Sequence, residues 1–222
     1  MKKAFTLAEI LLTLAIIGVA AALTLPALIT KVARDQYVVV LKKAYNTLKA
    51  VELEAVQEHG PLKNWNWTGN AATEFETYFK PYFDILKDCG ADTDNGCFAD
   101  SYPYMNGDTS ANLNRDKYYR IITSDGISIA YYSRGTNVSP ESKGFFNVDV
   151  NGRKGPNVIG KDLYIFLIFP TAGIKPGGSM KVVGGNLVPI PQEEVLEDCR
   201  EGGRGDYCAA RVLSENAINL KL

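Results

Sequence analysis

The sequence predicts an α+β protein in which one long N-terminal helix packs against an antiparallel β-sheet. The first 60 residues combine an uninterrupted apolar run with a helical repeat of apolar positions. Short strand-like segments separated by Gly, Asn and Asp follow, and four cysteines form two close pairs. A helix that precedes a series of strands is typical of the α+β class. We expect four segments: 1–4, 5–29, 30–60 and a globular head over 61–222.

The first segments form a basic leader, 1–4, and an apolar run, 5–29, whose polar members are Thr6, Glu9, Thr13 and Thr24. About 20 apolar residues span the ~30 Å hydrocarbon core of a bilayer. A secretory signal peptide cut after Ala20-Ala21-Ala22 would have a shorter apolar region without a charge. A plain signal anchor, with Lys2 and Lys3 in the cytoplasm, fits the charges. Neither explains Glu9, because a carboxylate inside a membrane costs about 2.5–3.5 kcal/mol.

The hexapeptide Ala4-Phe5-Thr6-Leu7-Ala8-Glu9 resembles the processing site of the type IV pilin and type II secretion pseudopilin superfamily. The resemblance implies that a prepilin peptidase cleaves between Ala4 and Phe5 and N-methylates Phe5. It also implies that Glu9 pairs with the α-amine of a neighbouring subunit. Gly18 and Pro26 fall where family members carry helix-loosening residues. Ala4 departs from the usual Gly, so we expect slower processing at most.

This implied role of Glu9 is physically reasonable. A buried carboxylate needs a cationic partner if it is to remain charged in lipid or in a helical core. Cleavage before Phe5 would create that cation on each neighbouring chain. The resemblance covers only about the first 30 residues, so it predicts how the chain assembles and leaves the head undefined.

The helix continues beyond the apolar run. Apolar residues recur at steps of three and four, which is the pattern of an amphipathic helix: Tyr37, Leu41, Ala44, Leu48, Val51 and Ala55. Gly60-Pro61 should end this helix, and Pro26 should kink or locally open it. The sequence therefore predicts a stem with a bare apolar first half and a second half that packs one face on the head.

The head contains several strand patterns and one predicted short helix, over 73–86. Segments 118–123 and 127–132 flank Ser124-Asp125-Gly126 and predict a hairpin. Segments 145–150 and 163–169 predict a second pair, and 182–183 with 187–188 a small third one. A short helix is expected near the C-terminus. This layout is similar to that of pilin-like heads, in which an antiparallel sheet lies against the second half of the helix.

The four cysteines, Cys89, Cys97, Cys199 and Cys208, follow an export segment, so disulfides formed outside the cytoplasm are the leading interpretation. Three connectivities are open. Sequential pairing is favoured because each close pair brackets a turn-rich loop. Zinc is the less favoured alternative, since neither pair has the short spacing of a zinc knuckle and the only histidine, His59, is remote.

Calcium is the one cofactor for which the head offers candidate ligands: Asp149, Asn151 and Asp162. These carry the oxygen atoms that calcium prefers, but they lack the full spacing of an EF-hand. The ordinary interpretation is a hairpin turn in which Asn151-Gly152 adopts positive φ.

Two interpretations are open for Trp65 and Trp67. Their rings could form an exposed aromatic surface, or they could pack under a loop.

Charge divides the head into an acidic stretch, 71–110, and a basic stretch, 111–161. Opposed segments suit lateral docking of subunits, and solvated loops are the ordinary alternative. The net charge is −1, and aromatic interleaving of the kind seen in nucleic-acid platforms is not evident, so no nucleic-acid partner is expected.

These features together predict a non-enzymatic filament subunit, most consistent with a type II secretion pseudopilin. Its expected partners are the prepilin peptidase, other pilin-like subunits and the bacterial inner membrane, which it would cross once with the head outside the cytoplasm. The alternatives are a true type IV pilin, major or minor, and a membrane-tethered periplasmic binding module of another class.

Overall fold

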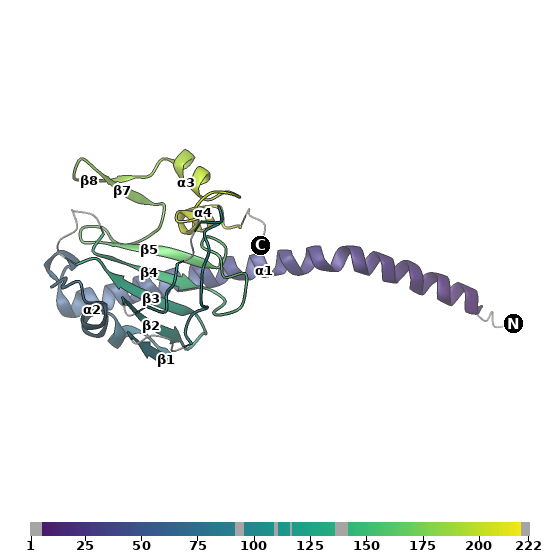
Figure 1. Ribbon diagram of the computed structural model, residues 1–222, viewed down its shortest axis with the longest axis horizontal. Coiled ribbons are helices and arrows are strands. Elements are labelled where there is room, and N and C mark those ends of the chain that lie inside the picture. Colours follow the sequence, from purple (N-terminus) through teal and green to yellow (C-terminus); the bar gives the residue numbers. More distant parts are fainter. Residues whose placement is uncertain (1–5, 92–95, 109–110, 116, 136–141, 219–222) are drawn as a thin grey trace.

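The first half of a single long helix projects from a head built around an antiparallel sheet (Figure 1). The computed structural model describes residues 6–91, 96–108, 111–115, 117–135 and 142–218. Helix α1 (Leu7–His59) runs without interruption through Pro26 and ends at Gly60, whose φ of 75° favours glycine. The helix therefore matches the predicted stem in length, and the chain stays helical across Pro26, where local opening was expected.

The second half of α1 buries one face against the sheet. Five positions of the predicted apolar stripe are fully buried and Tyr37 is half-buried: Leu41, Ala44, Leu48, Val51 and Ala55. The ring of Tyr45 stacks on Phe166 of the sheet with centroids 5.5 Å apart. Stacked aromatic pairs contribute beyond the area that they bury, so this half of the helix is part of the head's core.

The main sheet is an antiparallel meander in the order β1-β2-β3-β4-β5-β6. Its strands are β1 (Ile85–Gly90), β2 (Tyr118–Thr123), β3 (Ser128–Ser133), β4 (Gly144–Asp149), β5 (Leu163–Phe169) and β6 (Gly173–Pro176). The hairpin around Ser124-Asp125-Gly126 and the second strand pair are as predicted. A separate hairpin, β7 (Met180–Val183) with β8 (Asn186–Pro189), confirms the third pair.

The predicted helix over 73–86 is wrong in its second half. Helix α2 (Ala71–Tyr78) is followed by a 3₁₀ turn (Lys80–Tyr82), and the chain then enters β1. Pro81 explains the early end, since a proline cannot donate the backbone hydrogen bond of a helix interior and clashes with the preceding turn. A second 3₁₀ turn, Leu62–Asn64, follows α1. The tail forms two short helices, α3 (Gln192–Asp198) and α4 (Cys208–Glu215), where one was expected.

Aromatic rings fill the space between α2 and the inner face of the sheet. Phe79 lies 5.2 Å from Tyr131 and 5.1 Å from Phe146, measured between ring centroids. Trp65 and Trp67 are 5% and 3% exposed, and their indole N–H groups donate to the carbonyls of Gly60 and Leu62. The tryptophans are therefore core residues, and the alternative of an exposed aromatic surface is wrong.

Polar contacts fix α1 to the sheet at points well apart along the helix. Asn151 Nδ2 donates to the Tyr37 hydroxyl at 2.7 Å, and Lys43 pairs with Asp125 at 2.9 Å. One turn before the buried Ala55, the Glu52 carboxylate accepts the Ile174 N–H of β6 at 3.0 Å. Gly173, next to Ile174, has a φ of 76°, which favours glycine, and a Cβ atom there would displace the Glu52 carboxylate from this hydrogen bond.

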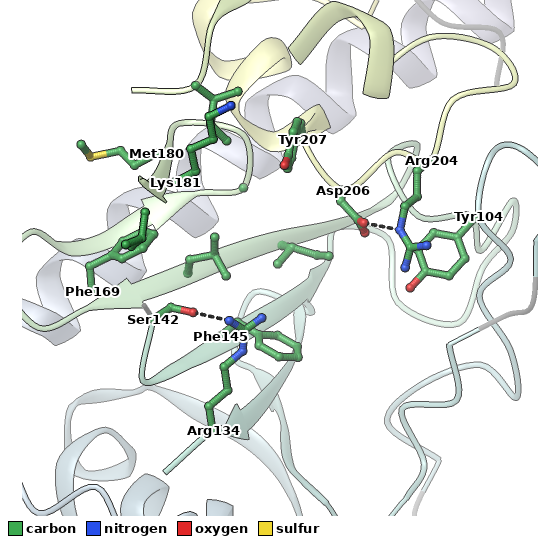
Figure 2. Close-up of a pocket in the computed structure, with 15 residues that line it drawn as sticks. Tyr104, Arg134, Ser142, Phe145, Phe169, Met180, Lys181, Arg204, Asp206 and Tyr207 are labelled. Carbon is green, nitrogen blue, oxygen red and sulfur yellow. Dashed lines mark hydrogen bonds and ion pairs between the residues drawn. The ribbon is translucent and has the colours of Figure 1, made fainter. Parts of the chain in front are cut away.

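The opposite face of the sheet has two different covers. Part of it lies under a second apolar cluster that includes Phe98, Tyr102 and Leu113. The β7–β8 hairpin and the segment from Arg204 to Tyr207 stand over β4 and β5 and leave a groove between them and the sheet (Figure 2).

Candidate functional site

Thr6 and Glu9 form a reciprocal cap at the start of α1. The Thr6 backbone N–H and hydroxyl each donate to Glu9 Oε2 at 2.8 Å, and the Glu9 N–H donates to Thr6 Oγ1 at 3.3 Å. The first N–H groups of a helix have no partner within it, and a capping box satisfies two of them. In the single chain the Glu9 carboxylate is thus held by its own helix end. A carboxylate has about four lone-pair sites, so it can accept a further donor.

Among the described residues, none packs around the apolar half of α1. Leu7 and Leu23 expose 77% and 76% of their surface, and the large side chains between them are similarly bare: Leu11, Leu12, Leu14, Ile16, Ile17 and Val19. By length and composition this is a helix that can span a membrane. Bare apolar surface of this extent marks contact with lipid or with other protein. Glu9 lies at one end of it.

Of the other predicted stem residues, Gly18 is described by the structure and Ala4 and Phe5 are not. Gly18 lies within this apolar half, and a Cβ atom there would meet nothing within 4 Å. The single chain therefore does not require a glycine at 18, whereas close contact with another helix would. Ala4 and Phe5, the predicted processing site, lie outside the described residues.

The loop between β4 and β5 brings the three predicted calcium ligands together in a hydrogen-bonded network. The Tyr102 hydroxyl donates to Asp149 Oδ2 at 2.5 Å, and the Asn151 N–H donates to Asp149 Oδ1 at 3.0 Å. The N–H groups of Asn157 and Val158 donate to the two oxygens of Asp162 at 2.6 and 2.7 Å. Both carboxylates are fully buried. Their oxygens thus hold the loop closed and, through Asn151 and Tyr37, hold it to α1.

Within the described ranges, no three His, Cys, Asp or Glu side chains gather as a metal would require. Two oxygens of the loop, Asn151 Oδ1 and Asn157 Oδ1, are buried without a hydrogen-bond partner among the described residues. Calcium stays a prediction, which a calcium-dependent rise in Tm would support, because a ligand bound only by the folded state stabilises it.

Asp149 should make stability depend on pH. Burial raises its pKa to about 8, opposed by the Tyr102 hydrogen bond and assisted by nearby Asp162. The folded state therefore binds this proton more tightly than the unfolded state, whose carboxyl has an ordinary pKa near 3.8. This tighter proton binding by Asp149 adds to the free energy of unfolding. The added stability is complete below about pH 4 and is lost as the pH rises towards about 8.

We expect Asp149→Asn to flatten the decline of unfolding free energy between pH 4 and 8 by at least ~1 kcal/mol. Denaturant titrations of the full chain in detergent, followed by the fluorescence of the buried Trp65 and Trp67, measure this decline. The exposed Asp100→Asn is the matched control and should keep the wild-type slope. Equal slopes for the wild type and Asp149→Asn would contradict the prediction.

The two disulfides join sequential cysteines and confirm the favoured connectivity. Cys89 bonds Cys97 and Cys199 bonds Cys208, with Cα atoms 6.4 and 4.9 Å apart. All four cysteines are thereby used, which removes the zinc alternative. Disulfides are typical of proteins outside the cytoplasm. The second bond also closes the loop that carries Arg204 and Tyr207 on the rim of the groove.

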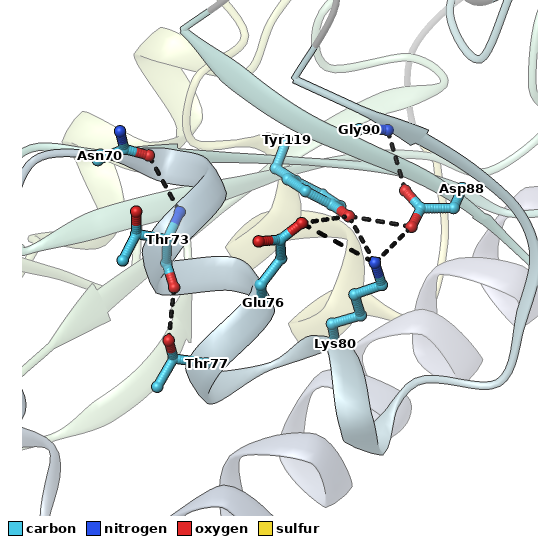
Figure 3. A network of polar contacts seen from close by, with 8 residues as sticks. All are labelled: Asn70, Thr73, Glu76, Thr77, Lys80, Asp88, Gly90 and Tyr119. Atoms are coloured by element: carbon cyan, nitrogen blue, oxygen red, sulfur yellow. Dashed lines mark hydrogen bonds and ion pairs between the residues drawn. The ribbon is translucent and has the colours of Figure 1, made fainter.

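A further polar cluster ties the 3₁₀ turn after α2 to the edge strand β1 (Figure 3). Lys80 Nζ lies 2.7 Å from Asp88 and donates to the Tyr119 hydroxyl at 2.9 Å, and that hydroxyl donates to Asp88 at 2.9 Å. The hydrogen bond to Asp88 raises the pKa of Lys80. This cluster is partly exposed and has paired charges, so its geometry indicates a structural role.

No family model, curated protein or solved structure matches this chain. The functional argument therefore rests on the stem, the loop, the disulfides and the groove. Sequence reasoning missed the Thr6 cap of the stem and the groove. The Thr6 cap was signalled by the Thr-x-x-Glu pattern of a capping box. The unbroken apolar run of β5 signalled only that both faces of this strand are covered, since such strands lose the alternation with polar residues.

Proposed function

We propose that this chain is a non-enzymatic structural subunit of a type IV pilus-like filament, most consistent with a type II secretion pseudopilin. The observation that carries the proposal is the division of α1. Its second half is built into the core of the head, whereas its first half is bare, apolar and begins at a carboxylate. Such a helix can reside in a membrane before assembly and can then pack among identical or related helices.

Assembly gives Glu9 its proposed role. After cleavage before Phe5, each chain presents a charged α-amine close to the start of its helix. A neighbour's amine is the donor that the Glu9 carboxylate can still accept beyond its Thr6 cap. Because an unpaired charge is costly in an apolar bundle, this pair fixes the register in which one helix packs beside the next.

The head supports the same proposal in two ways. Its antiparallel sheet lies on the continuation of the stem, so every subunit in a helical bundle carries a rigid domain outside the bundle. Its disulfides suit a head placed beyond the inner membrane. Prepilin peptidase and partner subunits are the partners that this function requires.

The deciding experiment is the mass of the intact protein and of its N-terminal peptide after expression in membranes with and without prepilin peptidase. We expect a mature chain that begins at N-methylated Phe5, and only when the peptidase is present. A chain that begins after Ala22 would indicate a secreted domain. An uncut chain that begins at Met1 would indicate a simple anchor, as in a membrane-tethered binding module, and either result would contradict the proposal.

A further inference from the structure

The outer face of the sheet, which is turned away from α1, is apolar where a solvated sheet face is normally polar. Along β5, Phe166 and Ile168 point to the core and are fully buried, while Ile165 and Leu167 alternate with them and are half-exposed. Phe145 of β4 pairs with Leu167 and extends the same surface. The three side chains form the floor of the groove.

The groove above this floor is large enough for part of another molecule. Met180 of β7 lies on one side of the groove and Tyr207, at the end of the loop, on another (Figure 2). Val182 also lines it. The groove encloses about 440 Å³. A water molecule occupies ~30 Å³ in the liquid, so more than ten would fit. A volume of ~300–1,000 Å³ is usual for a binding site.

Three cations stand at this groove, and two of them are already paired. Lys181 lies 2.6 Å from Glu194, and Arg204 lies 2.5 Å from Asp206 and 4.1 Å from the ring centre of Tyr104. Arg134 lies 5.4 Å from the ring centre of Phe145 and donates to Ser142 Oγ at 2.8 Å. Among the described residues no carboxylate pairs with it.

Arg134 is therefore the cation of the groove that has no carboxylate partner among the described residues. Its guanidinium lies over the Phe145 ring and is held by the Ser142 hydroxyl beside an apolar floor. A guanidinium in a fixed position binds a carboxylate through two parallel hydrogen bonds. An anion that enters here would meet a cation without a carboxylate partner in the described part of the chain.

We propose that this groove binds an extended, acidic segment of a partner protein, with apolar side chains on the floor and a carboxylate on Arg134. The mixture of aromatic rings, methionine and arginine is that of the central part of protein interfaces. An extended strand fits because its side chains alternate every residue between the two sides of the groove. Nucleic acid fits less well, since its affinity comes from many free cations and two of these three are neutralised.

The position of the groove suggests where such a partner would bind, an argument that rests on the proposed function. Assembly through α1 buries the stem, and the groove lies on the face of the sheet opposite to that helix. It would then remain accessible on the finished filament, where a secreted or peripheral protein with an acidic extended segment would dock.

The test uses the full chain in lipid nanodiscs and three fluorescein-labelled octapeptides, each with four repeats: Glu-Leu, Gln-Leu and Lys-Leu. Fluorescence anisotropy measures binding, with empty nanodiscs as the blank. We expect the Glu-Leu peptide to bind at least tenfold more tightly than the Gln-Leu peptide, and the Lys-Leu peptide to bind most weakly. Equal affinities for the three peptides would overturn the proposal.

Variants then locate the site. Arg134→Gln should weaken Glu-Leu binding at least tenfold, and Arg134→Lys should fall between it and the wild type, because lysine keeps the charge but loses the paired hydrogen bonds. The exposed Arg153→Gln, outside the groove, is the matched control and should stay within twofold. Equal losses for Arg134→Gln and Arg153→Gln would overturn the proposal, and an unchanged Tm establishes that the variants fold.

Two competitors separate the ligand classes. Displacement of the Glu-Leu peptide by millimolar inorganic phosphate would indicate a small-anion site, and tighter binding of a thymidine oligonucleotide would indicate a nucleic-acid surface. Either result would overturn the proposal. Glu9→Ala should bind the peptide as the wild type does, so failure of the groove and failure of filament assembly are measured separately.

Discussion

Glu9→Ala should insert into the membrane and be processed before Phe5 as the wild type is, yet yield at least tenfold fewer filaments. The physical reason is the neighbour's α-amine, which would be buried in an apolar bundle without a counter-charge. Removing one partner of a buried ion pair typically costs ~3–5 kcal/mol, and 1.4 kcal/mol corresponds to a factor of ten. Filament yield by shearing and electron microscopy, with peptide mass as the measure of processing, gives the answer.

Two controls separate the pairing role of Glu9 from its capping role. Thr6→Val removes the Thr6 hydroxyl that completes the cap but leaves the Glu9 carboxylate in place, so it should reduce assembly much less than Glu9→Ala. Glu193→Ala removes an exposed acid of the head and should assemble normally. Wild-type filament yield from Glu9→Ala, or equal losses from Thr6→Val and Glu9→Ala, would contradict the proposed register.

The second large effect should come from the C-terminal disulfide. Replacing Cys199 and Cys208 together by alanine should lower the unfolding free energy by about 2–4 kcal/mol, because the bond restricts the unfolded chain. Both sulfurs are fully buried in the main core. A head of this size should lose roughly 5–12 °C in Tm. Thermal unfolding of the full chain in detergent measures the loss.

The same double variant should also weaken Glu-Leu peptide binding, since Arg204 and Tyr207 lie within the loop that the bond closes. Replacing Cys89 and Cys97 by alanine is the matched control for binding, because that bond closes a loop of similar length outside the groove. A wild-type Tm for the Cys199 and Cys208 double variant would contradict the stabilising role. Equal binding losses in the two double variants would contradict the link to the groove.

The sequence predicted the stem and the hairpins because their signals are local. The apolar stripe of α1 and the turn at Ser124-Asp125-Gly126 each depend on residues close in the chain. Strands β1 and β6 were missed for the opposite reason. The segment Gly173–Pro176 carries both glycine and proline, which disfavour strands, and it pairs only because β5 offers it an edge.

The candidate sites also differ in whether their residues lie close together in the sequence. Glu9 and its Thr6 cap are visible in the sequence, because both lie in one helical turn. The groove joins Arg134, Leu167, Met180 and Tyr207, which come from separate elements, and no spacing pattern predicts that they meet. The calcium prediction identified residues that do lie together, but it could not foresee Tyr102, which reaches Asp149 from 47 positions away.

The way α1 is fixed to the sheet also has a mechanical consequence. Its polar attachments at Tyr37 and Glu52 are 15 residues apart, which is about 22 Å along a helix. A pull along the stem would load these attachments and the buried stripe between them in shear, all at the same time. Extraction of the helix then requires that these contacts break together. In the filament that we propose, a head would therefore resist a pull along its stem more strongly than if the same contacts broke one after another.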